Sequence, residues 1–202
     1  MLVTRLKLAY FNMLEERRLK KLSSPMFRKI DADWKRHYHR INPYKVCRTF
    51  WNNPHGIYGE TPLSALDPIL KECALGPSDV FYDLGAGRAR LAIYVAATYP
   101  CKVRAVEKIE LFNHHTMQLI ATYPLHLELH DADILEIDVS DATLIYFYGI
   151  TFSDNFIRKV AEKIPYGCRV ITVSEPLGGR FSVLKKYWVR YPWGKTEVFL
   201  QK

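Results

Sequence analysis

Short apolar runs and longer stretches with apolar residues at helical spacing alternate along most of this chain. Five runs have the length and composition of buried strands: 80–85, 102–108, 125–133, 142–149 and 168–176. The stretches between them predict helices over 88–99, 110–123 and 153–164. Because helices alternate with apolar strands, we expect a doubly wound α/β fold whose parallel sheet is covered on both faces.

Different patterns mark the two ends of the chain. Residues 185–201 form a strand pair without an intervening helix, so we expect an antiparallel hairpin that turns at Pro192-Trp193-Gly194. At the other end, residues 2–22 predict an amphipathic helix, and 26–54 predict a helix plus an irregular connector. We therefore divide the chain into a basic, mainly helical N-terminal extension, 1–55, and a sheet domain, 56–202.

A further helix is predicted between these two parts. Thr61 is a candidate N-cap, because Pro62 follows it and a proline at the first helical position loses no hydrogen bond. Gly76-Pro77 ends the apolar helical pattern that follows.

The net charge of +8 is concentrated at the N-terminus. Residues 1–50 hold 13 Lys and Arg against 4 Asp and Glu, whereas the rest holds 16 against 17. This asymmetry favours an anionic partner for residues 1–50: a nucleic acid, a membrane surface or an acidic protein. The alternative is a solvated basic face that only aids solubility.

The bulk composition is that of an ordinary globular protein, with 49% hydrophobic and 25% charged residues. Charges interrupt the apolar N-terminal residues too often for a secretory signal, so we expect a cytoplasmic protein. Four cysteines lie far apart and without CxxC spacing, which predicts free thiols and no metal site.

A glycine turn follows the first predicted strand in "DLGAGRA". Gly85 and Gly87 let the backbone turn tightly beside a ligand, and ligands of parallel sheets bind at the carboxyl ends of strands. Carboxylates end three successive strands. Glu107 is placed to bind ribose hydroxyls, Asp133 to reach an adenine amino group, and Asp83 to face a cationic group.

A nicotinamide cofactor is the alternative ligand for such a turn. The sequence departs from GxGxxG, and Asp83 would lie awkwardly near a pyrophosphate. S-adenosylmethionine, which carries an ammonium and a sulfonium, suits these acids better.

These residues resemble a known family. "DLGAG", "AVEK" and "DAD" are similar to the pattern of class I S-adenosylmethionine-dependent methyltransferases, which have a Rossmann-like fold. More narrowly, "IYGETPL", "VFYDLGAG", "VAATYPCK", "VEK" and "WGKTEVFL" resemble the non-SET lysine methyltransferases of the disruptor-of-telomeric-silencing type, over residues 57–201. The resemblance implies that the loop around "YGET" closes over the methionyl end of the cofactor. It implies these cofactor-binding residues: Tyr58, Glu60, Thr61, Asp83, Gly85, Ala86, Gly87, Glu107, Lys108, Asp133 and Ile134.

Two positions depart from the family pattern. Ala89 replaces a usual glycine, and "YFYG" places Tyr148 and Gly149 where the histone-modifying members have an asparagine pair. Histone specificity is therefore not implied.

We expect a methyltransferase that acts on a protein lysine. Tyr148 and Phe152, with Tyr58 and Trp193, are candidates to wall a dry aromatic channel that favours the neutral amine, although plain packing would also explain them. Two alternatives stay open: methylation of a small molecule or RNA on the same fold, and a non-catalytic protein that binds nucleic acid or a membrane surface.

Overall fold

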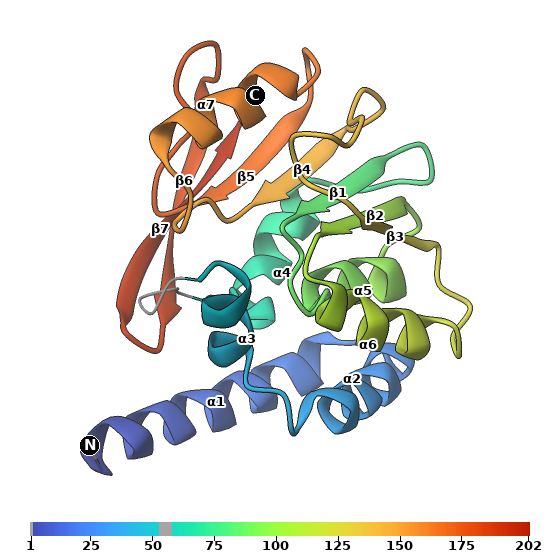
Figure 1. The fold of residues 1–202 in the computed structure, drawn as a ribbon, viewed down its shortest axis with the longest axis vertical. Coiled ribbons are helices and arrows are strands. Elements are labelled where there is room, and N and C mark those ends of the chain that lie inside the picture. Colours follow the sequence, from blue (N-terminus) through green and yellow to red (C-terminus); the bar gives the residue numbers. More distant parts are fainter. Residues whose placement is uncertain (1, 53–57) are drawn as a thin grey trace.

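One mixed sheet organises the computed structural model, which describes residues 2–52 and 58–202 (Figure 1). Its strands are β1 (Val80–Leu84), β2 (Lys102–Glu107), β3 (Leu127–Asp131), β4 (Leu144–Phe147), β5 (Arg169–Val173), β6 (Val183–Tyr191) and β7 (Gly194–Gln201). They lie in the order β3-β2-β1-β4-β5-β7-β6. The first five are parallel, and β7 runs antiparallel to both β5 and β6. The predicted doubly wound sheet with a closing hairpin is confirmed.

Helices cover both faces of this sheet. On one face, α4 (Leu63–Glu72), α5 (Arg90–Thr98) and α6 (Glu110–Ile120) share an apolar cluster with strand residues such as Phe81 and Leu144. On the other, α7 (Asp154–Lys163) packs against strand residues that include Tyr82 and Phe147. Each predicted strand–helix unit is present, although the structure shortens most of the predicted ranges by one to three residues at an end.

The N-terminal region forms α1 (Leu2–Leu22), α2 (Pro25–Tyr38) and α3 (Pro43–Phe50). The predicted irregular connector was wrong in part, because α3 is a helix. It begins at a proline whose preceding residue, Asn42, accepts the backbone N–H of Lys45 at 3.1 Å. Phe27, Trp34 and Tyr38 of α2 are buried in the main apolar cluster, so this region packs on the sheet domain. The N-terminal half of α1 extends beyond the body of the molecule (Figure 1).

The start of α4 differs from the prediction. Thr61 does not cap this helix; Pro62 is its N-cap and supplies no side-chain bond. The Thr61 hydroxyl instead bonds to the hydroxyls of Tyr146 of β4 and Tyr191 of β6. Glu15 of α1 takes over the capping role, since its carboxylate accepts the Ser64 N–H at 2.9 Å.

The strand order reverses between β1 and β4, which places the glycine turn at the position where open α/β sheets bind ligands. Gly85 and Gly87 have left-handed φ values of 77° and 56°, which glycine adopts without strain. The backbone N–H of Gly85 donates to Val106 O of β2 at 2.9 Å and ties the turn to the sheet. In the described part of the chain, no helix has the length and apolarity that crossing a membrane requires.

Candidate active site

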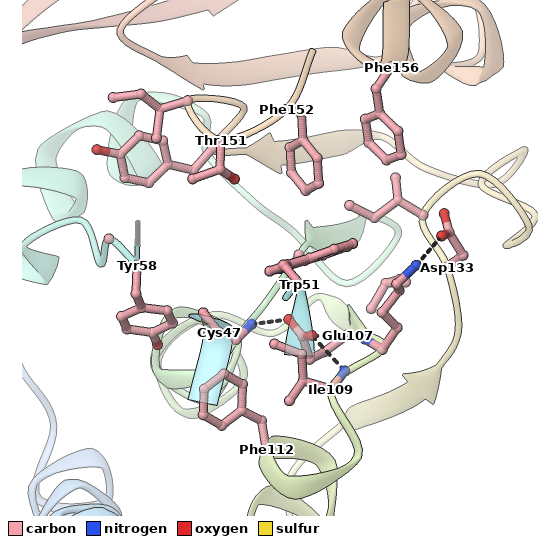
Figure 2. A pocket seen from close by; sticks show the side chains of 18 of the residues that line it. Cys47, Trp51, Tyr58, Glu107, Ile109, Phe112, Asp133, Thr151, Phe152 and Phe156 are labelled. Atoms are coloured by element: carbon pink, nitrogen blue, oxygen red, sulfur yellow. Dashed lines mark hydrogen bonds and ion pairs between the residues drawn. The ribbon is translucent and has the colours of Figure 1, made fainter. Parts of the chain in front are cut away.

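A pocket opens beside the glycine turn, with a mouth open to solvent. Nine of the predicted site residues line it: Tyr58, Gly85, Gly87, Glu107, Lys108, Asp133, Ile134, Tyr148 and Phe152. Tyr58 of the "YGET" segment and the residues at the carboxyl ends of the strands thus line one cavity (Figure 2).

Four predicted residues lie outside the lining: Glu60, Thr61, Asp83 and Ala86. Glu60 binds the hydroxyl of Tyr58, and Thr61 is bonded to its two tyrosines. Asp83 is buried, with 3% of its surface exposed, and the Ala86 N–H donates to Val106 O. Their roles toward a cofactor stay predictions. Gly56 and Ile57, the start of the predicted lid, lie outside the described residues.

Glu107 ends β2 and is held by backbone donors. One carboxylate oxygen accepts the Gly87 N–H at 2.7 Å, and the other accepts the N–H groups of Lys108 and Ile109 at 2.9 and 2.8 Å. Burial raises the pKa of this carboxyl, although the three N–H bonds oppose the rise. The bonds fix the carboxylate at the pocket wall and link the glycine turn to β2 (Figure 2).

Asp133 lies just beyond β3, in a turn, rather than at the strand end that the pattern predicted. One oxygen accepts the N–H of Leu135, and the other pairs with Lys108 Nζ at 2.7 Å. Burial favours a raised pKa, but Lys108 and the Leu135 N–H outweigh it and lower the pKa of Asp133. Lys108 and Asp133 therefore form an ion pair across the pocket edge.

Tyr58 of the "YGET" segment packs against Gly87 of the glycine turn. A Cβ on Gly87 would approach the Tyr58 hydroxyl to 2.9 Å, so only a glycine lets this ring pack so closely. Burial, followed by the charge of Glu60, keeps the pKa of Tyr58 well above its usual value. The protonated phenol donates to Glu60 Oε1 at 2.6 Å.

Aromatic side chains form the wall beyond β4. Phe152 stacks between Phe147 and Phe156, with ring centroids 5.8 and 4.4 Å apart. Burial raises the pKa of Tyr148 to about 12. The expected contribution of Trp193 to this wall was wrong, because Trp193 is exposed in the β6–β7 turn, where its ring packs on that of Tyr191 and does not line the pocket.

Helices α3 and α6 also contribute to the pocket, which the sequence did not predict. Cys47 and Trp51 of the α3 region and Phe112 of α6 also line the pocket, and Figure 2 shows Trp51 projecting among them. Lys108 Nζ lies 4.9 Å from the centre of the Trp51 ring. The Asn42-Pro43 capping signal was the available clue to α3. Within residues 2–52 and 58–202, no cluster of three or more His, Cys, Asp or Glu has the arrangement of a metal site.

The chemistry of the lining fits a nucleoside-bearing cofactor. A fixed carboxylate at the end of the second strand, a second acid after the third strand, and apolar or aromatic walls match what an adenosine requires. Outside the lining, the Asp83 carboxylate adds negative charge near the turn when it is ionised, which suits a cationic group, whereas the charge of Glu60 is paired with Arg88 at 2.8 Å.

Known proteins are similar to this chain in sequence or in fold. The profile of the family described as "Histone methylation protein DOT1" matches residues 40–145, just over half of the chain. A protein-lysine N-methyltransferase of Saccharolobus islandicus is 24% identical over 59% of this chain and 76% of its own length. The H3 lysine-79-specific histone-lysine N-methyltransferase of Caenorhabditis elegans is 25% identical over 58% of this chain, which spans only 15% of that protein.

A solved RNA methyltransferase from Salinibacter ruber, in complex with S-adenosyl-L-homocysteine, has the same fold. It superposes with a TM-score of 0.54 at 22% identity and covers 71% of this chain and 92% of its own. Sequence profile, strand order and pocket position agree, so the chain belongs to the DOT1 family of histone methylation proteins and carries the fold of class I S-adenosylmethionine-dependent methyltransferases.

Proposed function

We propose that this S-adenosylmethionine-dependent methyltransferase transfers its methyl group to the side-chain amine of a protein lysine. Family membership supports a protein acceptor. The archaeal and nematode relatives, both lysine methyltransferases by name, support lysine as the acceptor residue. The sequence departure at Tyr148 leaves histones without special support among protein acceptors.

The observation that carries the proposal is the aromatic wall after β4. A lysine amine must lose its proton before it attacks a methyl group, and its free pKa is about 10.4. Tyr148, Phe152 and Phe156 offer a wall without charge, and burial beside such a wall disfavours the ammonium form. The wall also excludes water from the reacting groups and orients them, which contributes much of the rate in such transfers.

Three residues of the lining would hold the nucleoside of the cofactor: Glu107 would receive the ribose hydroxyls, and Asp133 and Ile134 the adenine. Asp83, which lies buried behind the lining, would attract the ammonium group. When bound, S-adenosylmethionine supplies an electrophilic methyl group on a sulfonium. The protein itself then aligns the amine and keeps it neutral.

The test is to incubate the protein with methyl-labelled cofactor and cell extract divided into protein, RNA and small-molecule fractions. We expect label in the protein fraction, and methyl-lysine after hydrolysis of that fraction. Label confined to RNA or to small molecules would contradict a lysine acceptor while leaving the methyltransferase assignment intact.

A further inference from the structure

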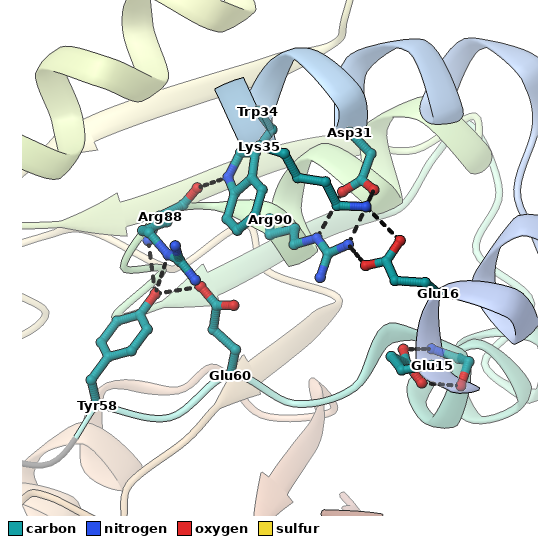
Figure 3. A network of polar contacts seen from close by, with 10 residues as sticks. Glu15, Glu16, Asp31, Trp34, Lys35, Tyr58, Glu60, Arg88 and Arg90 are labelled. Atoms are coloured by element: carbon teal, nitrogen blue, oxygen red, sulfur yellow. Dashed lines mark hydrogen bonds and ion pairs between the residues drawn. The ribbon is translucent and has the colours of Figure 1, made fainter. Parts of the chain in front are cut away.

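Arg88 follows the glycine turn directly, yet its side chain points away from solvent. Only 16% of the side chain is exposed. Its Nε donates to Glu60 Oε1 at 2.8 Å and lies 3.4 Å from the Tyr58 hydroxyl (Figure 3). A cation at the turn is thus engaged with both the tyrosine that lines the pocket and the acid behind it.

Two aromatic residues of α2 pack against the guanidinium of Arg88. The guanidinium carbon lies 4.4 Å from the centre of the Trp34 ring and 5.5 Å from that of the Tyr38 ring, and the Tyr58 ring lies 5.6 Å away. The indole N–H of Trp34 also donates to the backbone oxygen of Arg88 at 2.8 Å. Three aromatic rings around one guanidinium form a favourable cation–π arrangement, particularly where water is excluded.

These contacts form a continuous path from the N-terminal region to the cofactor pocket. Trp34 donates a hydrogen bond to the backbone of Arg88. The Arg88 side chain in turn bonds Tyr58 and Glu60. The ring of Tyr58 then packs on Gly87 in the pocket wall. Arginine keeps its charge at all accessible pH values, so Glu60 always has its partner. Without Arg88, Glu60 would lose its cation, and the Tyr58 hydroxyl would keep only an unpaired carboxylate as its side-chain hydrogen-bond partner.

We propose that Arg88 is a positioning residue, which transmits the packing of α2 to Tyr58 and thereby sets the wall of the cofactor pocket. The N-terminal helices are on this account part of the cofactor site. No acceptor needs to be known to test this, because the effect is on cofactor affinity.

Arg90 provides a matched control. Its side chain is also 16% exposed, and its guanidinium also lies on Trp34, at 4.9 Å. Its ion pairs, however, are with Asp31 at 2.8 Å and Glu16 at 3.1 Å, both in the N-terminal helices (Figure 3). Losing Arg90 therefore removes a comparable ion pair without touching Tyr58.

The experiment compares Arg88→Gln with Arg90→Gln in calorimetric titrations with S-adenosylhomocysteine, together with the melting temperature of each variant. We expect both substitutions to lower the melting temperature. Arg88→Gln should raise the Kd about tenfold, the effect of unpairing a part-buried charged hydrogen bond. Arg90→Gln should change the Kd less than about twofold, because the hydrogen bonds of Arg90 do not reach Tyr58 or Glu60 and Trp34 keeps its own bond to Arg88.

A double-mutant cycle tests the route through Tyr58. In a Tyr58→Phe background, Arg88→Gln should weaken binding much less than it does in the wild type, because the hydroxyl that it positions is already gone. An unchanged Kd for Arg88→Gln would overturn the proposal, as would equal losses for the two arginine variants or full additivity in the cycle. If Arg88→Gln does not fold, Arg88→Lys replaces it, and wild-type affinity in that variant likewise counts against the proposal.

Discussion

Asp83 carries the most strongly perturbed carboxyl of the candidate site. Burial raises its pKa to about 7, and the charges of Glu107 and Glu60 act in the same direction. Below pH 7 the carboxyl is protonated and attracts the cofactor ammonium less. We therefore expect the Kd for S-adenosylhomocysteine to rise about tenfold from pH 8 to pH 6, as for a site with one essential ionised group of pKa near 7. Calorimetric titrations across this range measure it.

Asp83→Asn is the control, since it should bind the cofactor product more weakly at pH 8 and lose most of this pH dependence.

The raised pKa of Asp83 also makes the stability of the fold depend on pH. A folded-state pKa above the ordinary 3.8 favours the protonated carboxyl, so its stabilising contribution is complete below about pH 4 and is lost as the pH rises through 7. A wild-type Kd that is flat between pH 6 and pH 8 would remove Asp83 from the site.

Gly87 tests whether Tyr58 and the glycine turn are in contact. Its φ of 56° makes an alanine strained, and the added methyl would meet the Tyr58 hydroxyl at 2.9 Å. Gly179 has a similar φ of 73° but open space around it. We expect both alanine variants to lose about 1–2 kcal/mol of stability from backbone strain. Only Gly87→Ala should also weaken cofactor binding, and equal binding by both variants would contradict the contact.

Among the elements, the strands were the most predictable. A buried parallel strand requires a short apolar run, and each such run in this sequence became a strand. The glycine turn and Glu107 were predictable for a similar reason, because strand ends are fixed by the sheet. The Thr61 cap failed because the competing bonds, to Tyr146 and Tyr191, come from strands 85 and 130 residues later in the chain.

The contribution of α3 could not be read from spacing alone. Trp51 follows a short helix whose position beside Lys108 depends on tertiary packing. For the same reason, the sequence did not predict that Tyr58 lines the pocket whereas Glu60, two residues later in the same motif, lies outside the lining and bonds the Tyr58 hydroxyl.

Glu15 of α1 caps the N-terminus of α4. Its buried carboxylate accepts the N–H and the hydroxyl of Ser64 in the first turn of α4, which has no side-chain cap of its own. Glu15→Ala should lower the free energy of unfolding by about 1–2 kcal/mol, the usual effect of losing a helix cap. Arg17→Ala, an exposed change on the same helix, should alter it by less than about 0.5 kcal/mol. Denaturant titration measures both, and equal effects would show that Glu15 is not a cap.

The whole molecule has an uneven charge distribution that the structure explains in part. All four acids of residues 1–50 have partners: Glu15 with Ser64, Glu16 and Asp31 with Arg90, and Asp33 with Tyr123. Many of the 13 basic residues are exposed. The N-terminal region therefore exposes an excess of positive charge to solvent. Its acids bond instead to residues of the sheet domain.

A fourfold substitution tests the proposal that this face binds an anionic partner. Arg17, Arg18, Lys20 and Lys21 are exposed on α1, so changing all four to Gln should leave the cofactor Kd within about twofold. Methylation of a macromolecular acceptor should fall, most strongly at low salt, because exposed charges are screened over about 8–10 Å at physiological ionic strength. Rates equal to wild type at 20 mM salt, an ionic strength of roughly one-seventh of the physiological value, would make the basic face a solubility feature.

A calorimetric titration of the wild-type protein and Glu107→Gln with S-adenosylhomocysteine, with NAD as the comparison ligand, tests which cofactor this pocket binds. We expect saturable binding of S-adenosylhomocysteine to the wild type and no heat with NAD. Glu107→Gln should bind at least about tenfold more weakly, since an amide cannot accept all three N–H bonds and the ribose hydroxyls. Binding of NAD alone, or equal affinity in the variant, would contradict the assignment of this pocket to the methyl-donor cofactor.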